Sequence, residues 1–374
     1  VSLLDVVLAL ALGRTPFDFF TGNMTNVIIT LFLMTIYGVM VGGISQMREI
    51  VKEAEIYKRE RLVNLQIFPY IFSKVWIAAL LAFYQAAAYV IVHYIAFDMP
   101  GGVIEFILIY ITMVLVTFAG MMLGLFASAV APNANSAPLI VIILMLPQIV
   151  LGGAIVPVPP AVSAPTSTRW ALEAMMSVTG AGSDVISDVC WALPPEIRDS
   201  MTMEQKLENN CKCMGVNLLN PDSCNHPGIG AFRVGELDGP LPVEPVRPPD
   251  PVLPERPVQP EDQSDSIAMA DYFAKLQAWE AEATAIQAAS QQAFAQYERD
   301  LELYIEARKN IETSVAPAEG VVRTFYNAIY WGYVNKEDTV AYYGKVITAW
   351  FVQMLICLLL FVAILVFQKR KDVI

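Results

Sequence analysis

The chain has 374 residues, of which 56% are hydrophobic and 16% are charged, and its formal net charge at pH 7 is −12. Charged residues make up roughly 25% of an ordinary soluble domain, so this composition and a mean hydropathy of +0.50 argue against a wholly soluble protein. The acidic balance also argues against nucleic acid as a partner.

Residues 1–13 are apolar but too few to cross a bilayer. They lack the basic head and the small-residue cleavage site of a secretory signal peptide, and the first residue is Val1. We therefore expect residues 1–13 to be the outer end of a first membrane span that is truncated here.

Five further stretches carry almost no charge, and each is long enough to cross a hydrocarbon core of about 30 Å. They lie at residues 27–46, 72–96, 104–130, 139–156 and 346–367. With the truncated first span, they predict an α-helical membrane protein with six spans. Lys74, His93 and Glu105 lie near span ends, so the spans lack the central ionisable groups typical of ion-coupled transporters.

Basic residues beside spans mark the cytoplasmic side of a membrane protein. Two such clusters flank the second and third spans and follow the last one: Arg48, Lys52, Lys58, Arg59, Arg61 and Lys74, then Lys369, Arg370 and Lys371. If both clusters are cytoplasmic, residues 157–345 lie outside and the C-terminus inside. This topology predicts a multi-pass protein of the plasma (inner) membrane.

Residues 46–62 leave the second span as a charged amphipathic helix. In helical register, one apolar stripe runs through Ile44, Met47, Val51, Ala54 and Tyr57. Such a helix could lie on anionic lipid. However, the charges of its acidic residues nearly cancel those of its basic residues. A protein partner that binds both positive and negative side chains therefore fits this helix better.

The predicted outer segment, residues 157–345, contains Cys190, Cys211, Cys213 and Cys224 within residues 183–227. Outside a cell, four thiols so close together usually form two disulfides. Three pairings are open, and Cys211 with Cys213 is the least favoured because of ring strain. A zinc site that uses His226 is an alternative, but the spacing lacks the usual paired C-x₂₋₄-C motif, so no metal is expected.

Two contrasting segments follow the cysteines. Residues 239–262 are rich in proline, which favours an extended polyproline II spacer. Residues 264–312 contain no proline or glycine and predict one long helix, a helical hairpin or a coiled coil. Their seven-residue stripe needs a partner to cover it, and its members are Met269, Leu276, Ala283, Tyr297, Tyr304 and Ile311.

The domain organisation expected from these features has three parts. Residues 1–156 hold spans one to five, residues 157–345 form the extracytoplasmic domain, and residues 346–374 supply the last span with a basic tail. No GxxxxGK[ST] motif occurs, so the chain has no nucleotide-binding P-loop, and no catalytic motif replaces it.

A more specific pattern lies after the second span, where a glutamate and an aromatic residue precede Arg-Glu-Arg, with a tyrosine near the next span. These residues are Glu53, Tyr57, Arg59, Glu60, Arg61 and Tyr70. The pattern resembles the coupling helix of the permease half of G-type (white-like) ABC transporters, within the type-2 ABC exporter superfamily. It is most similar to bacterial members whose ATPase is fused to a forkhead-associated domain. Ala54 stands where that family often has a basic residue.

The resemblance covers residues 27–176 and the last span, with Trp170 and Glu173 where the family has a re-entrant element. It implies a homodimeric permease that exports an amphipathic or lipid-like substrate, with ATP and Mg²⁺ on an ATPase domain outside this chain. It places Glu53, Tyr57, Arg59, Glu60 and Arg61 at the ATPase interface. The alternative hypothesis is a membrane-anchored scaffold whose outer domain binds a partner protein.

Overall fold

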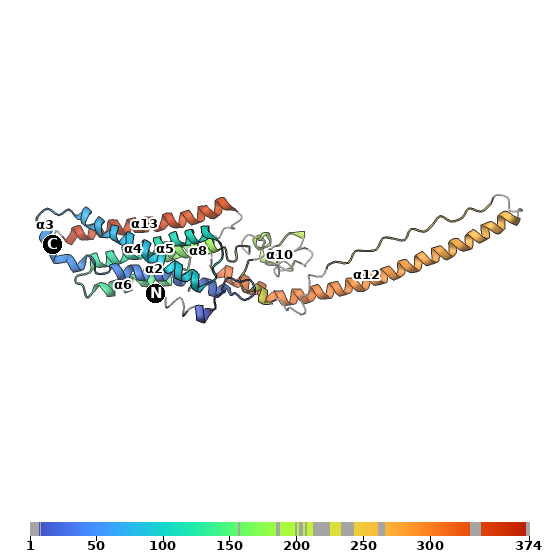
Figure 1. The fold of residues 1–374 in the computed structure, drawn as a ribbon, viewed down its shortest axis with the longest axis horizontal. Helices are drawn as coiled ribbons and strands as arrows, with labels where there is room; N and C mark the ends of the chain where they lie inside the picture. Colours follow the sequence, from blue (N-terminus) through green and yellow to red (C-terminus); the bar gives the residue numbers. More distant parts are fainter. Residues whose placement is uncertain are drawn as a thin grey trace. The chain divides into compact units, whose positions relative to one another are not determined.

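The structure is a computed structural model that describes residues 7, 9–155, 158–184, 188–198, 200–201, 205, 208–211, 225–232, 243–260, 266–329 and 338–371. The chain forms two compact units (Figure 1). The first combines Val1–Arg233 with Val315–Ile374, and the second is Val234–Ser314.

Among the described residues of the first unit, four helical stretches are long and apolar enough to cross a membrane. The first runs over Met24–Leu62 and contains α2 (Met24–Gln46), η1 (Val51–Glu53) and α3 (Ala54–Leu62). The others are α4 (Ile67–Ala96), α5 (Val103–Val130) and α13 (Thr339–Lys371). The positions of these stretches confirm that the spans predicted at residues 27–46, 72–96, 104–130 and 346–367 are helices long and apolar enough to cross a membrane.

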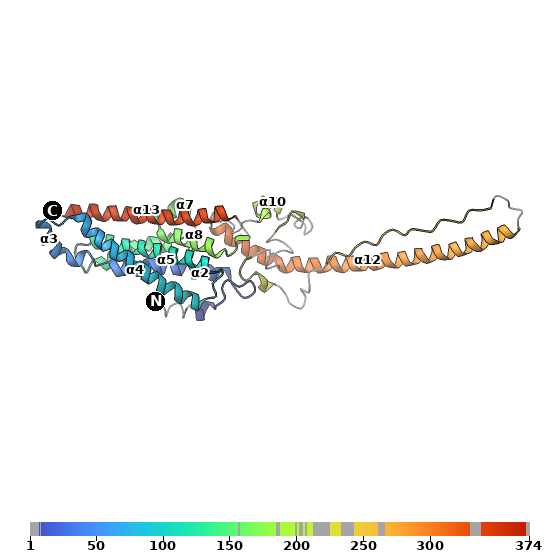
Figure 2. The same ribbon diagram turned by 45° about the horizontal axis from the view of Figure 1, so that its top comes forward.

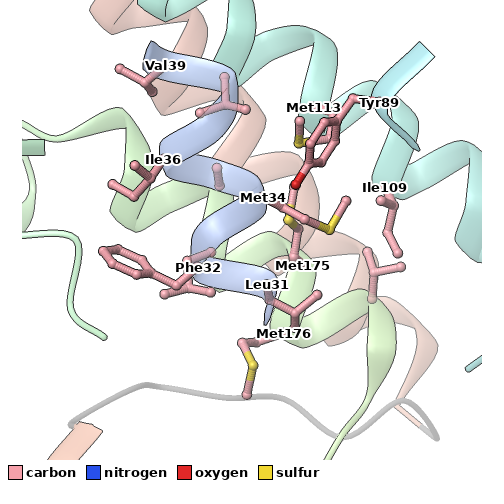
Figure 3. Packing of buried hydrophobic residues seen from close by; sticks show 14 of the residues in the cluster. Leu31, Phe32, Met34, Ile36, Val39, Tyr89, Ile109, Met113, Met175 and Met176 are labelled. Carbon is pink, nitrogen blue, oxygen red and sulfur yellow. The ribbon is translucent and has the colours of Figure 1, made fainter. Parts of the chain in front are cut away.

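Helix α5 is the centre of this unit and packs against α2, α4, α6, α8 and α13. Figure 2 shows α13 running along the bundle beside α4 and α5. A single apolar cluster joins α2, α4, α5 and α8, and Figure 3 shows part of it. Its fully buried members include Leu31, Met34, Ile109, Met113 and Met175.

Glycines bring the backbones of α2 and α5 into direct contact. A Cβ atom added at Gly120 would lie 2.4 Å from the Val39 carbonyl oxygen, and one at Gly124 would lie 2.4 Å from the Gly43 carbonyl oxygen. On the other helix, a Cβ atom at Gly42 would lie 2.3 Å from the Thr117 carbonyl oxygen. Small residues four apart are a common way to pack membrane helices closely.

The glycine contact can be tested with Gly120→Leu. The new side chain must push the two backbones apart, so we expect the free energy of unfolding to fall by about 3 kcal/mol. Thermal unfolding in mild detergent measures the change. Gly344→Leu is the matched control, because no atom lies within 4 Å of a Cβ atom added at Gly344. Equal unfolding temperatures for both variants would contradict the packing.

The fifth predicted span, residues 139–156, differs from the structure. Helix α6 covers only Ala137–Val150, which is 14 residues and therefore about 21 Å long at 1.5 Å per residue. The chain then turns through Gly153, whose φ is +91°, into α7 (Pro160–Ser163) and α8 (Ser167–Thr179). All residues of α8 except Trp170 are buried, and α8 packs against α2, α5, α6 and α13.

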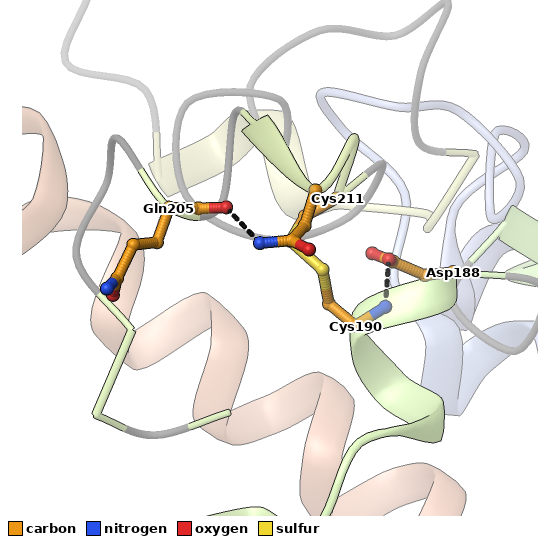
Figure 4. Close-up of a disulfide and its surroundings, with 5 residues drawn as sticks. Asp188, Cys190, Gln205 and Cys211 are labelled. Carbon is orange, nitrogen blue, oxygen red and sulfur yellow. Dashed lines mark hydrogen bonds between the residues drawn. A yellow bond between two sulfur atoms is a disulfide. The ribbon is translucent and has the colours of Figure 1, made fainter. Parts of the chain in front are cut away.

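The cysteine region is only partly described. It contains η2 (Val189–Ala192), α10 (Pro195–Arg198) and, after the cysteines, η4 (Ile229–Phe232). Cys190 and Cys211 form a disulfide with a Cα–Cα distance of 5.4 Å, and the Asp188 carboxylate accepts a hydrogen bond from the Cys190 N–H at 2.9 Å (Figure 4). One disulfide of the expected two is thus confirmed. Cys213 and Cys224 lie outside the described residues.

The second unit contains the proline-rich segment and the first part of α12. Helix α12 is one continuous helix of 64 residues, Ser266–Ile329, which confirms the single long helix and excludes the hairpin. The Trp279 indole N–H donates to the Pro254 carbonyl oxygen at 2.8 Å. The Arg247 guanidinium lies 5.8 Å from the centre of the Phe294 ring. The proline-rich segment therefore runs antiparallel to α12.

Proline recurs at every third position of this segment, which matches the three residues per turn of polyproline II. Most of these prolines are partly buried: Pro245, Pro248, Pro254, Pro257 and Pro260. On α12, Leu276 and Ala283 of the predicted stripe are likewise covered, whereas Val246 and Val258 on another face of the segment are 91% and 90% exposed. The segment expected to be a spacer thus packs along the helix. Ile311 lies outside the described side chains.

Candidate functional site

The candidate site begins where α2 ends. Residues 47–50 form turns, η1 follows, and α3 is a separate helix rather than a continuation of α2. The predicted stripe from Ile44 to Tyr57 is therefore broken, and Ile44 is 51% exposed. The Ser128 hydroxyl oxygen accepts hydrogen bonds from the N–H groups of Ile50 at 2.9 Å and Val51 at 3.0 Å. These two hydrogen bonds fix the start of η1 to the end of α5.

Glu53 fixes the same segment to α4. Its carboxylate accepts a hydrogen bond from the Lys74 ammonium at 2.6 Å and another from the Tyr70 hydroxyl at 3.2 Å. The Tyr57 ring lies 4.9 Å from the Tyr70 ring and is only 4% exposed. Glu53 and Tyr57 therefore face the helices of the first unit, although the resemblance in the sequence placed both at the ATPase interface.

The turn after α3 is also fixed. Asn64 has a φ of +79°, in the left-handed region that asparagine tolerates better than most residues. Arg61 is partly buried and donates from its guanidinium to the Leu65 carbonyl oxygen. Arg61 thus stabilises the connection from α3 to α4.

The outer face of this segment, which we call the docking face, consists of exposed side chains on and after α3. Arg59 and Glu60 are both exposed there. Three apolar residues that the sequence analysis did not select are exposed beside them: Ile56 at 52%, Leu62 at 89% and Val63 at 83%. They could have been found in the sequence, because they are apolar residues that lie outside the inward-facing stripe of an otherwise charged helix. Exposed apolar side chains among charges are typical of a protein-binding surface.

The end of α13 completes the support beneath α3. The Lys371 ammonium donates to the Ala131 carbonyl oxygen at 2.9 Å, at the C-terminal end of α5. A shallow groove beside it is lined by residues that include Ala54, Tyr57 and Gln368. The segment thus contacts residues of α4, α5 and α13.

A second polar cluster joins α8 to α13. The Glu173 carboxylate is 5% exposed and lies 3.0 Å from the Lys345 ammonium and 3.4 Å from the Arg169 guanidinium. The Arg169 guanidinium also lies 4.5 Å from the centre of the Trp170 ring, and the Trp170 indole donates to the Ala164 carbonyl oxygen at 2.8 Å. The sequence analysis selected Trp170 and Glu173 but not Lys345, which is 172 residues away.

Two substitutions test the Glu173 cluster. Glu173→Gln leaves two cations without their carboxylate, so we expect it to destabilise the protein by about 3 kcal/mol. Lys345→Met should cost less, because the Lys345 side chain is 32% exposed and Arg169 still pairs with Glu173. Thermal unfolding of both variants in detergent gives this order. The reverse order would show that Arg169 does not pair with Glu173.

The described residues contain one close group of three possible metal ligands, Asp188, Cys190 and Cys211. Both of its cysteines are committed to the disulfide. His226, the alternative zinc ligand, is 3% exposed, and burial lowers its pKa to about 4, so it is neutral at pH 7. Cys224, its expected neighbour in a zinc site, lies outside the described residues.

Comparison with known proteins gives one family. Residues 1–176 match the family model described as ABC-2 type transporter. The matched region includes α2 to α7 and most of α8, and with them the docking face and its contacts with α4 and α5, but not α13. A comparison with curated proteins finds no match.

Proposed function

We propose that this protein is the permease of an ATP-driven exporter of the G-type subfamily, because residues 1–176 match the family model described as ABC-2 type transporter. The proposed cargo is an amphipathic or lipid-like molecule. The observation that carries the proposal is the docking face, an exposed mixed apolar and charged surface supported from beneath by α4, α5 and α13.

In this proposal an ABC ATPase domain binds the docking face and moves it during ATP binding and hydrolysis. Ile56, Arg59 and Glu60 make the contact. Inside the permease, the Ser128 hydroxyl carries the displacement to α5, and the ion pair of Glu53 with Lys74 carries it to α4. ATP and Mg²⁺ belong to the ATPase.

The assembly we propose is a homodimer in the plasma (inner) membrane, with six spans in each copy. The first of the six includes residues 1–13. The ATPase is either separate or fused upstream together with a forkhead-associated domain. Residues 157–345 are extracytoplasmic and the C-terminus is cytoplasmic, which agrees with the basic residues that end α13. The Cys190–Cys211 disulfide fits an oxidising compartment.

The exposed and the buried residues of this segment should respond differently to substitution, which tests the proposal. Arg59→Glu combined with Ile56→Asp should reduce copurification of the ATPase domain at least about tenfold, because both side chains lie at the proposed contact. The permease itself should unfold at the same temperature as before. Tyr57→Ala should have the opposite pattern. It should lower the unfolding temperature, because the Tyr57 ring packs against the Tyr70 ring, and it should leave copurification of the ATPase domain unchanged. The measurements are affinity copurification and thermal unfolding in mild detergent.

Lys275→Glu is the control for charge reversal, since Lys275 is an exposed residue of the second unit. Unchanged copurification of the ATPase domain by the Arg59→Glu, Ile56→Asp variant would reject the docking face.

A membrane-anchored scaffold is the second candidate, favoured by the separate compact unit Val234–Ser314. If no ABC ATPase copurifies with the unchanged protein, the scaffold becomes the better account.

A further inference from the structure

A groove of about 240 Å³ lies beside the C-terminal end of α4. Residues 9–12 are helical, and Ala9 and Leu10 form one wall of the groove. The other wall belongs to α4 and consists of three apolar residues: Val92, Ile95 and Ala96. Both walls therefore suit a hydrocarbon chain.

Arg14 is the charged residue that lines this groove. Its side chain is exposed, and its guanidinium donates a hydrogen bond to the Ile95 carbonyl oxygen at 3.1 Å. Its own carbonyl oxygen accepts the N–H of Asp98 at 2.8 Å. These two hydrogen bonds hold the Arg14 guanidinium over the end of α4, at the edge of the apolar walls.

The positive charge of Arg14 selects the kind of ligand. A guanidinium has five N–H donors, and the Ile95 carbonyl oxygen takes one of them. Within the part of the chain that the structure describes, no carboxylate lies within 4.0 Å of this guanidinium. An accessible cation beside an apolar groove favours a molecule that carries both an anionic group and a hydrocarbon chain.

The position of Arg14 along α4 indicates where that anion comes from. Helix α4 has 30 residues and is therefore about 45 Å long at 1.5 Å per residue, which matches the roughly 40–45 Å of a bilayer with its headgroup regions. The docking face adjoins the start of α4, whereas Arg14 lies at its end. If the docking face lies at one membrane surface, Arg14 lies at the phosphate level of the opposite leaflet.

We propose that this groove binds a phospholipid of the leaflet opposite the docking face. The Arg14 guanidinium donates to the lipid phosphate, a pairing that its planar fork of donors favours. One acyl chain lies between Leu10 and Val92 and continues along α4 into the hydrocarbon. The site depends on the membrane placement of α4 and not on the docking face, so it holds whether or not an ATPase binds there.

The probe is a phosphatidylglycerol with a photoreactive diazirine in one acyl chain, added to the delipidated full chain in mild detergent. Labelled peptides are identified by mass spectrometry. Three competitors separate the two parts of the ligand: unmodified phosphatidylglycerol, diacylglycerol with the same chains, and glycerol 3-phosphate. We expect labelling on residues 9–12 and the end of α4. Phosphatidylglycerol should compete at least about tenfold better than diacylglycerol, as a charge-assisted hydrogen bond provides, and glycerol 3-phosphate should not compete.

Two pairs of variants keep the test specific. Arg14→Gln should reduce labelling about tenfold without lowering the unfolding temperature in detergent, because Arg14 is exposed. Arg370→Gln is its control, since Arg370 is an exposed arginine of the basic end of α13. Val92→Trp should block labelling by filling the groove. Ile91→Trp is its control, because Ile91 is 50% exposed and does not line the groove.

Three results would overturn the proposal. Equal competition by phosphatidylglycerol and diacylglycerol would show that Arg14 does not bind the phosphate, and competition by glycerol 3-phosphate would show an anion site without a lipid chain. Labelling spread evenly over the exposed faces of α4 and α13, and unchanged by Arg14→Gln and Val92→Trp, would show ordinary surrounding lipid only.

Discussion

The contact between α2 and α5 is the constraint on which the candidate site depends. Gly120 and Gly124 of α5 meet the backbone of α2 at Val39 and Gly43, and Ser128, four residues further along, receives the N–H groups of Ile50 and Val51. The first two positions must lack a side chain for the helices to touch. The third needs a small side chain with an acceptor, because η1 begins there and the first N–H groups of a helix have no partner within it.

In the proposed transporter, the contact between α2 and α5 would let one short segment act on the whole bundle. Since α5 also packs against α4, α8 and α13, a displacement that begins at Ser128 would reach the helix that contacts most of the unit. At the other end of α13, Lys345 pairs with Glu173 of α8. Beside this close approach of α2 to α5, a cavity between α2 and α4 is lined by residues that include Tyr37 and Tyr89.

Hydropathy was sufficient to predict four helices that are long and apolar enough to cross a membrane, because such a long apolar run is rare in soluble domains. It overestimated the length of the apolar helix within residues 139–156, since composition does not reveal that α6 stops at Val150 and that α8 is buried. For the candidate site, the sequence predicted a segment but not the direction of its side chains. The turns at residues 47–50 rotate α3 relative to α2, so Tyr57 points inward and Leu62 outward.

Long-range partners were beyond the reach of sequence patterns in other places too. Nothing near Glu173 indicates that Lys345 is its partner, and nothing near Cys190 selects Cys211 among the available cysteines. In the proline-rich segment, by contrast, the sequence does contain a pattern that predicts the packing. Its three-residue period matches a polyproline II helix with one face packed, and this face lies on the covered stripe of α12.

The central claim is that the exposed face of α3 contacts an ATPase. Photocrosslinking from single positions in native membranes tests it most directly, with the photoreactive residue at position 62 of the docking face and, for comparison, at position 344 of α13. The account predicts a crosslink to an ABC ATPase domain from position 62 that changes in yield when ATP is added, and none from position 344. Absence of an ATPase crosslink from position 62, with the protein folded in the membrane, would contradict it.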